Sequence, residues 1–260
     1  MTGASSNEPV LIEADVDGIR LLTLNRPDQR NSLNKELASA LFAALEIANA
    51  DVAVRVVVLT GADPAFCAGI DLKEAARGGA DFFRHLDSRC VTYVGQMSKP
   101  IIGAINGAAI TGGFEIALGC DFLIASERAV FADTHARVGI LPGGGMTARL
   151  PGAVGLRQAK LLSMTGDLID ARRAERLGLV AEVVPHQELV DRALEIARTI
   201  GEIDPLVIGS IKRMYAEGSE TTLGEALELE RAIAGNARAD FSELGARRDA
   251  VMQRNRSQLP

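Results

Sequence analysis

The sequence predicts an α/β fold that is followed by an all-helical C-terminal region. Short aliphatic runs with strand character alternate with helical patterns up to Val184, and glycine-containing turns separate them. From Glu188 onward only helical patterns remain. We therefore expect residues 1–184 to form the core, and residues 185–260 to form a helical region that packs on partner subunits or on its own core.

Local patterns justify each element in turn. The pair Asp17-Gly18 between two apolar runs predicts a β-hairpin, and Asn34 is placed to cap the helix that follows. Strands are expected at residues 10–15, 19–24, 54–59, 101–105, 122–125, 129–131 and 179–184. Helices are expected at residues 35–50, 81–97, 156–164, 171–177, 188–200, 205–217 and 223–236, and a mobile loop is expected at residues 77–80.

Composition excludes several classes of function. The 260 residues are 47% hydrophobic, enough for a sizeable core, and the net charge of −6 argues against a general nucleic-acid binder. The longest uncharged run, Pro100 to Phe114, is too short to span a membrane, so no membrane insertion is expected. Three cysteines in a long chain are typical of free thiols in a reducing compartment, which predicts a cytoplasmic protein.

The stretch from Asn106 to Gly145 carries most of the chemistry. After a strand-like run, Gly112 and Gly113 open an apolar helical segment with Glu115 in its first turn. Paired glycines let the backbone approach a ligand, and free N–H groups at a helix start suit an oxygen that carries negative charge. Glu115 is either a buried acid/base group or a carboxylate that only stabilises its helix.

A second glycine turn lies in the segment Ala65-Phe66-Cys67-Ala68-Gly69-Ile70-Asp71-Leu72. It again offers bare backbone next to a helix start. Cys67 has no basic neighbour in sequence, so a catalytic thiol is the less favoured interpretation there. His85 and His186 have polar neighbours and are interpreted as surface residues.

Together these residues resemble the enoyl-CoA hydratase/isomerase (crotonase) superfamily, over about residues 10–240. The resemblance is carried by Asn25-Arg26-Pro27, the segment 65–72, Lys99-Pro100, Asn106-Gly107, Gly112-Gly113-Phe114-Glu115, Cys120-Asp121, Gly139, Pro142-Gly143, Thr165-Gly166 and Gly178-Leu179-Val180. It implies a spiral of ββα units, a C-terminal helical trimerisation region, a homotrimer or hexamer, and an acyl-CoA ligand. No cofactor is implied, because coenzyme A is part of the substrate, and no metal is expected.

The resemblance also implies roles for particular residues. The N–H groups of Ile70 and Gly112 match the pair that holds the thioester oxygen, and the Ala68 backbone matches the contact to the adenine. Gly69, Asp71 and Leu72 belong to the same binding segment. Asp63-Pro64 stands where the family often has a basic residue near the adenosine, so the candidates for holding the nucleotide phosphates are Arg26, Arg30 and the arginines of the tail.

One departure from the family pattern concerns the catalytic pair. Hydratases of this superfamily usually carry two glutamates; Glu115 matches the first, and His135 stands at the second position. The histidine is either the second acid/base group, suited to neutral pH by its ordinary pKa of about 6.5, or a polar residue that lines the pocket and bonds to Asp133 or Arg137.

Three functions are compatible with these residues. The favoured one is a 2-enoyl-CoA hydratase in which Glu115 activates water and His135 delivers a proton. A second is an isomerase or another lyase that uses the same enolate chemistry, and a third is a non-catalytic acyl-CoA-binding protein. Resemblance of fold alone does not separate them.

Overall fold

The computed structural model describes residues 8–236 and 244–258, and the chain divides into two compact units, Met1–Gly209 and Ser210–Pro260. The strands are β1 (Leu11–Val16), β2 (Ile19–Leu24), β3 (Val56–Gly61), β4 (Ala65–Cys67), β5 (Ile101–Ile105), β6 (Ala108–Ile110), β7 (Phe122–Ser126), β8 (Val130–Ala132), β9 (Ile169–Asp170) and β10 (Glu182–Val184). The helices are α1 (Lys35–Ala50), α2 (Leu72–His85), α3 (Arg89–Thr92), α4 (Gly112–Gly119), α5 (His135–Val138), α6 (Met146–Val154), α7 (Leu156–Thr165), α8 (Ala171–Arg176), α9 (Leu189–Gly201), α10 (Pro205–Gly218), α11 (Leu223–Asn236) and α12 (Leu244–Gln258).

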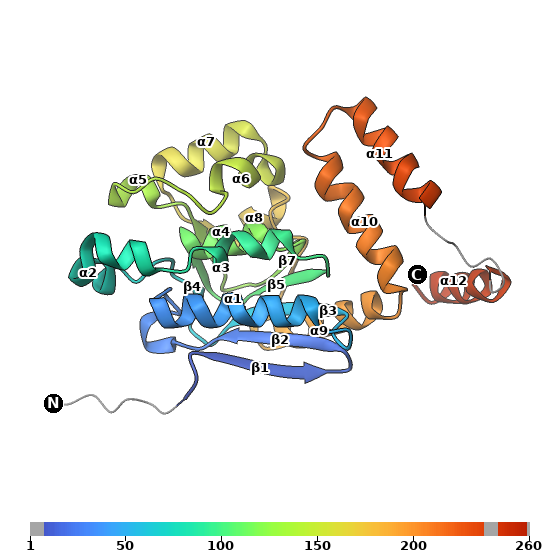
Figure 1. The fold of residues 1–260 in the computed structure, drawn as a ribbon, viewed down its shortest axis with the longest axis horizontal. Coiled ribbons are helices and arrows are strands. Elements are labelled where there is room, and N and C mark those ends of the chain that lie inside the picture. The colour runs from blue at the N-terminus through green and yellow to red at the C-terminus, as the bar shows by residue number, and fades with distance from the viewer. Residues whose placement is uncertain (1–7, 237–243, 259–260) are drawn as a thin grey trace. The chain divides into compact units, whose positions relative to one another are not determined.

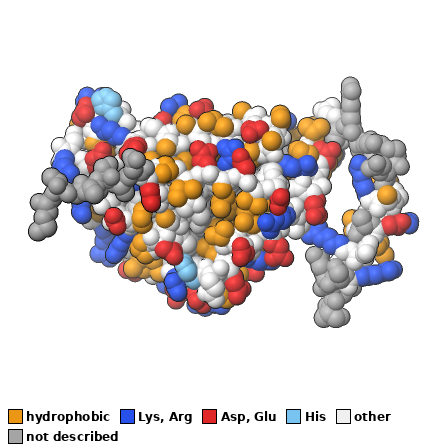
Figure 2. Space-filling model, turned by 90° about the horizontal axis from the view of Figure 1, so that it is seen from below, with side chains coloured by type: hydrophobic (Ala, Val, Ile, Leu, Met, Phe, Trp, Pro, Cys, Tyr) orange, Lys and Arg blue, Asp and Glu red, His pale blue; other side chains and the backbone are white. Residues whose placement is uncertain are grey.

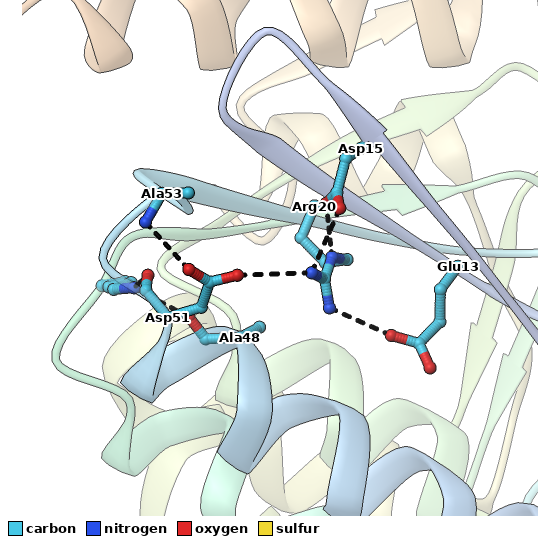
Figure 3. Close-up of polar contacts among 7 residues, drawn as sticks. Glu13, Asp15, Arg20, Ala48, Asp51 and Ala53 are labelled. Carbon is cyan, nitrogen blue, oxygen red and sulfur yellow. Dashed lines mark hydrogen bonds and ion pairs between the residues drawn. The ribbon is translucent and has the colours of Figure 1, made fainter.

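The predicted hairpin is confirmed, because β1 and β2 pair antiparallel across Asp17-Gly18. An ionic cluster fastens this hairpin to the end of α1 (Figure 3). The Arg20 guanidinium contacts Asp15 at 2.5 Å, Glu13 at 3.1 Å and Asp51 at 3.7 Å, while its own side chain is only 10% exposed. Asp51 also accepts a hydrogen bond from the Ala53 N–H, so one carboxylate joins the hairpin to the turn that follows α1.

Helix α1 begins where the sequence predicts. The Asn34 side chain accepts the N–H of Leu37 at 2.8 Å, which satisfies one of the unpaired donors at the helix start. The apolar face that contains Leu37, Leu41 and Leu45 is fully buried in the core. In Figure 1, α1 lies along β1 and β2 and covers them.

The larger sheet has six strands in the order β1-β2-β3-β5-β7-β10, and all neighbours except β1 and β2 run parallel. Every residue of β3 and β5 is buried, as expected of strands covered on both faces. One cover is α9, whose buried residues Leu189, Ala193 and Ala197 pack on this sheet. The first compact unit thus extends to Gly209 and includes α9, the first α-helix of the region that begins at residue 185. Of the two arrangements expected for that region, α9 shows packing on its own core.

The smaller sheet has the order β4-β6-β8-β9, with β4, β6 and β8 parallel. Helix α4 follows β6 directly and contacts α3, α6, β4 and β6, so it lies in the middle of the first unit (Figure 1). The carboxyl ends of parallel strands meet at one edge of a sheet, and this is where ligands bind in many α/β folds. Here that edge leads into residues 68–70, 111–112 and 133–135.

Two expectations for residues 77–97 are wrong. The expected mobile loop at residues 77–80 lies inside α2, where Gly79 adopts φ 52° and kinks the helix. The expected helix at residues 81–97 is broken near Leu86, since α2 ends at His85 and α3 starts at Arg89. Asp87 accepts the N–H of Arg89, and this local side-chain bond competes with continuation of the helix.

In the second unit, α11 begins and ends as predicted, and α10 extends one residue beyond its predicted end. Apolar side chains of the second unit are exposed at Ile211, Tyr215, Leu223 and Leu227.

In the part of the chain that the structure describes, none of the helices is long and apolar enough to cross a membrane. On the face drawn in Figure 2, acidic and basic side chains are interspersed with hydrophobic ones.

Candidate active site

A cavity of about 260 Å³ lies where the parallel strands of the smaller sheet end. Most of its wall is apolar, and the wall includes the carboxyl group of Glu115 and the imidazole of His135. The lining consists of Leu33, Ala68, Ile70, Leu72, Phe83, Leu86, Ser88, Cys90, Val91, Thr111, Gly112, Glu115, Thr134, His135, Val138, Ile140, Leu141, Gly143 and Gly144. The structure therefore brings together residues from three glycine-containing segments that lie far apart in sequence.

Glu115 occupies the first turn of α4 and is 4% exposed. Its Oε1 atom accepts two backbone N–H groups from residues 141–146, which are called the glycine loop: those of Gly144 at 2.8 Å and Met146 at 3.2 Å. These bonds satisfy the buried carboxylate and fix its orientation. Its other oxygen, Oε2, lies 3.8 Å from the Nε2 atom of His135. One oxygen of Glu115 is thus anchored while the other faces the histidine.

His135 is the first residue of α5 and is held by Asp133. The Nδ1 atom lies 2.7 Å from Asp133 Oδ1, and the His135 backbone N–H donates to the same oxygen at 3.2 Å. A carboxylate partner places the proton of the neutral ring on Nδ1 and leaves the lone pair on Nε2. Nε2 is the atom that faces Glu115. His135 thus lines the cavity and bonds to Asp133, as expected of a polar lining residue, and its Nε2 atom also faces Glu115, as an acid/base role would require.

The charges around His135 favour its protonated form. Burial opposes protonation, but the hydrogen bond to Asp133 and the negative charges of Glu115 and Asp133 outweigh it and raise the pKa of His135 above its ordinary value. Burial also acts to raise the pKa of Asp133, yet hydrogen bonds from His135 and Ser163 hold that pKa below its ordinary value. His135 and Asp133 thus stabilise each other's charged forms.

The two candidate oxyanion donors lie side by side. A Cβ atom built on Gly112 would lie 3.9 Å from the Ile70 nitrogen and 3.7 Å from the Gly69 Cα. Before Gly112, Thr111 adopts φ 46° and ψ −113°, a strained conformation that turns β6 sharply into α4. Strain at this point is consistent with a backbone that is shaped for ligand contact rather than for local stability.

The remaining predicted binding residues divide into two groups. Ala68, Ile70, Leu72 and Gly112 line the cavity, whereas Arg26, Gly69 and Asp71 are not part of its wall. Gly69 has φ 86°, and a Cβ there would lie 2.1 Å from the Thr111 Oγ1 atom, so this glycine is required by packing. Arg26 and Asp71 bond to each other at 3.1 Å.

Among the other candidates, the thiol of Cys67 is fully buried, and burial raises its pKa to about 12, which disfavours a nucleophilic thiolate. His85 is exposed, as expected. His186 differs from the expectation of a plain surface residue, because its ring is half-buried and lies between Ser126 at 3.0 Å and Asp63 at 2.9 Å.

Known proteins of one family match most of this chain. The family model described as enoyl-CoA hydratase/isomerase matches residues 15–243. The chain belongs to the enoyl-CoA hydratase/isomerase family. It is 38% identical over 226 residues to a protein of Arabidopsis thaliana named probable enoyl-CoA hydratase 1, peroxisomal, covering 87% of this chain and 85% of that protein. It is 37% identical to the mitochondrial enoyl-CoA hydratase of Pongo abelii, covering 83% of this chain and 74% of that protein.

Solved structures of the same family share the fold. An enoyl-CoA hydratase from Bacillus anthracis aligns with a TM-score of 0.88 at 35% identity, covering 94% of this chain and 96% of that one. An enoyl-CoA hydratase from Mycobacterium tuberculosis aligns with a TM-score of 0.73 at 44% identity, covering 87% and 98%. The expected crotonase fold with its helical C-terminal region is thereby confirmed for this member of the enoyl-CoA hydratase/isomerase family.

Sequence reasoning missed one residue of the site. Asp133 entered only as a possible partner of His135, whereas the structure makes it the residue that holds the imidazole. The sequence offered one signal for this role: Asp133 stands two residues before His135, directly after a buried strand. An Asp side chain readily accepts the N–H group two residues further along the chain.

Proposed function

We propose that this protein adds water to 2-enoyl-CoA thioesters. The observation that carries the proposal is the pairing of Glu115 and His135, whose facing atoms are 3.8 Å apart, beside two adjacent backbone donors in an apolar cavity. Two acid/base groups suit an addition in which one proton is removed and another is delivered. An isomerase or binding protein has no need of both, so the geometry favours the hydratase among the three candidate functions.

In the proposed hydration, the Glu115 carboxylate takes a proton from water as the water oxygen bonds to C3. The electron pair of the C2–C3 double bond moves toward the thioester, and the N–H groups of Ile70 and Gly112 stabilise the enolate oxygen; one such donor contributes roughly 3–4 kcal/mol. Protonated His135 then delivers its Nε2 proton to C2. The sum is one added water, and proton exchange between the two residues restores the starting state.

The electrostatic surroundings of His135 favour this direction of reaction. Hydration requires an ionised Glu115 and a protonated His135 at the start. Despite burial, the Asp133 hydrogen bond and the neighbouring negative charges raise the pKa of His135, which keeps the imidazolium populated to higher pH than for an isolated histidine. Asp133 supports this state as a positioning residue, because it bonds to the nitrogen that faces away from the reaction.

The cavity wall points to an aliphatic acyl group. Leu72, Phe83, Leu86 and Leu141 surround its apolar part, and they come from α2, the turn after it and the glycine loop. The Ala68 N–H already donates to the Arg30 carbonyl at 3.0 Å, so a contact from this residue to the adenine uses its carbonyl oxygen. Coenzyme A enters as part of the substrate, and the reaction drawn here uses no further cofactor.

The proposal includes assembly as a homotrimer or hexamer through the C-terminal helices. It is supported by the apolar side chains exposed on those helices, which are typical of surfaces that become buried on association. Light scattering at micromolar concentration is expected to give three or six times the mass of one chain, and a monomer would contradict this part. A cytoplasmic location stays a prediction, since the relatives include proteins named as peroxisomal and mitochondrial.

A substrate panel tests the reaction. Purified protein is given 2-enoyl-, 3-enoyl- and 3-hydroxyacyl-CoA esters, and the loss of absorbance of the conjugated thioester is followed together with the product mass. We expect 2-enoyl-CoA to gain the mass of one water. Formation of 2-enoyl-CoA from the 3-enoyl ester at a faster rate than hydration would make the protein an isomerase instead.

Two variants test the catalytic pair. Glu115→Gln and His135→Ala are each expected to lower kcat by about 10²–10⁴, and the double variant is expected to be little worse than the poorer single one, because the two groups act on one reaction. The exposed residues His85 and Glu188 supply the matched controls His85→Ala and Glu188→Gln, which are expected to keep the wild-type rate. A wild-type rate in His135→Ala would leave Glu115 as the sole acid/base group.

A further inference from the structure

The segment that carries Ile70 is bound along its edge by the loop at residues 26–33. The N–H of Leu33 donates to the Gly69 carbonyl at 2.7 Å, and the N–H of Asp71 donates to the Leu33 carbonyl at 3.0 Å. This is a parallel β-bridge between Leu33 and Ile70. In such a bridge the residues on either side of Ile70 use their backbone groups toward Leu33, so the N–H of Ile70 itself faces the opposite side. Gly112 lies close to this N–H, since a Cβ atom built on Gly112 would be 3.9 Å from the Ile70 nitrogen.

Arg26 holds the same two segments together through its side chain. Its Nη1 atom donates to the Ser32 carbonyl at 2.5 Å, and its Nη2 atom donates to Asp71 Oδ2 at 3.1 Å. The Arg26 and Asp71 side chains are 16% and 9% exposed, so water competes weakly for this ion pair. Arg26 therefore closes the loop at residues 26–33 onto the residue that follows Ile70.

Asp71 extends the connection to α2. Its Oδ1 atom accepts the N–H groups of Lys73 at 3.2 Å and Glu74 at 3.1 Å, which caps the start of the helix. One carboxylate thus binds the Arg26 cation with one oxygen and the helix start with the other. Ile70 lies between this fixed point and the Gly69 carbonyl that accepts from Leu33, so the backbone that carries the Ile70 N–H is restrained on both sides.

We propose that the Arg26–Asp71 ion pair positions the Ile70 N–H for the oxyanion hole and that Arg26 does not bind the phosphates of the substrate. This inference rests on the proposed function, because the oxyanion is that of the bound thioester. Arg26 and Asp71 are positioning residues: they act on the thioester through the Ile70 backbone. An oxyanion donor works by being fixed before charge develops, so an ion pair that restrains the donor lowers the barrier without touching the substrate.

The test compares Arg26→Gln and Asp71→Asn with the wild type. Asparagine keeps the acceptor that caps α2 but removes the charge that Arg26 binds. Each variant is expected to lower kcat by about 10- to 100-fold, the range for a misplaced donor, with KM for the acyl-CoA changed less than about threefold. The double variant is expected to be little worse than either single one, because one interaction is lost in all three.

A second measurement reports the oxyanion hole without turnover. The carbonyl carbon of a saturated acyl-CoA is labelled with ¹³C, and the infrared C=O stretch of the bound thioester is recorded. Hydrogen bonds from the protein lower this frequency, so both variants are expected to move it back toward its value in water. Arg192→Gln, which breaks an ion pair with Glu182 that does not line the cavity, is the matched control and is expected to change neither readout.

The outcomes separate this inference from the proposed function. Wild-type kcat and an unchanged carbonyl frequency in folded Arg26→Gln and Asp71→Asn would overturn the positioning role. A large rise in KM with kcat and carbonyl frequency unchanged would also overturn it and would assign Arg26 to binding the nucleotide. If the wild type hydrates no 2-enoyl-CoA, the proposed reaction fails, while the carbonyl frequency of the non-reacting ligand still decides whether the ion pair positions Ile70.

Discussion

Replacing Asp133 with asparagine is expected to change the pH dependence of hydration more than the binding of substrate. The Asp133 side chain is 2% exposed and lies 2.7 Å from Nδ1 of His135. Asparagine keeps the size and an oxygen acceptor for the ring but removes the negative charge. Because Asp133 and Glu115 outweigh the burial that opposes protonation of His135, loss of one of the two charges lowers the pKa of His135.

The magnitude follows from the type of hydrogen bond that is lost. A bond to a charged partner contributes about 1.5–3 kcal/mol and a neutral one about 0.5–1.5 kcal/mol, so the change weakens protonation by the difference, about 1–1.5 kcal/mol. That corresponds to about tenfold in the protonation equilibrium. His135 must be protonated to deliver its proton, and activity is therefore lost as pH rises through the pKa of His135. Lowering this pKa moves the alkaline limb of the profile to lower pH.

The assay is kcat/KM for a short 2-enoyl-CoA between about pH 5 and 9, in the wild type, in Asp133→Asn and in the exposed control Asp167→Asn. The deficit of Asp133→Asn is expected to be about ten times larger at the alkaline end than at the acid end, and Asp167→Asn is expected to follow the wild type. A uniform loss at every pH would show that Asp133 only supports the fold, and a profile identical to that of the wild type would refute the role given to it.

Further predictions concern the oxyanion hole and the core. Gly112→Ala is expected to fold, since its new Cβ makes only contacts of 3.7 Å or more, but to lower kcat by about 10² or more by crowding the thioester oxygen. Gly113→Ala is expected to destabilise the fold itself, because its Cβ would lie 2.0 Å from the Cys67 carbonyl oxygen; a wild-type melting temperature would contradict this. Arg20→Met should lower the free energy of unfolding by about 1–2 kcal/mol in urea titrations, since it breaks charge-assisted bonds to half-exposed carboxylates. A free energy of unfolding equal to that of the wild type would show that the ionic cluster does not stabilise the fold. Leu45→Ala should cost about 2–5 kcal/mol in the same titration, as expected of a fully buried leucine.

Much of the secondary structure could be predicted because its signals are local. The turn Asp17-Gly18, the cap Asn34 and the aliphatic strands carry their own periodicity and turn chemistry, and the structure places these elements within a few residues of the expected bounds. Residues 77–97 were predicted wrongly because two local signals compete there. Gly79 suggests a break but is tolerated inside α2 as a kink, while the capping of Arg89 by Asp87 interrupts a segment that otherwise has helical character.

The candidate acid/base residue and the two glycine turns were also visible in sequence, because strand ends and helix starts expose backbone groups in a predictable way. The motifs named Ile70, Gly112, Glu115 and His135 but left the role of the histidine open. Tertiary structure decided the position of the histidine by bringing the ends of β4, β6 and β8 to one cavity, which sets Oε2 of Glu115 opposite Nε2 of His135.

Tertiary structure alone also decided the place of Arg26. Its sequence neighbours suggest a free cation at a loop, suitable for phosphate, whereas the fold pairs it with Asp71, 45 residues away in the chain. Distances between such residues depend on how the sheets stack and on which backbone groups are left to pair. No local pattern encodes that, since the free energy of burying an ion pair depends on the surrounding atoms that exclude water.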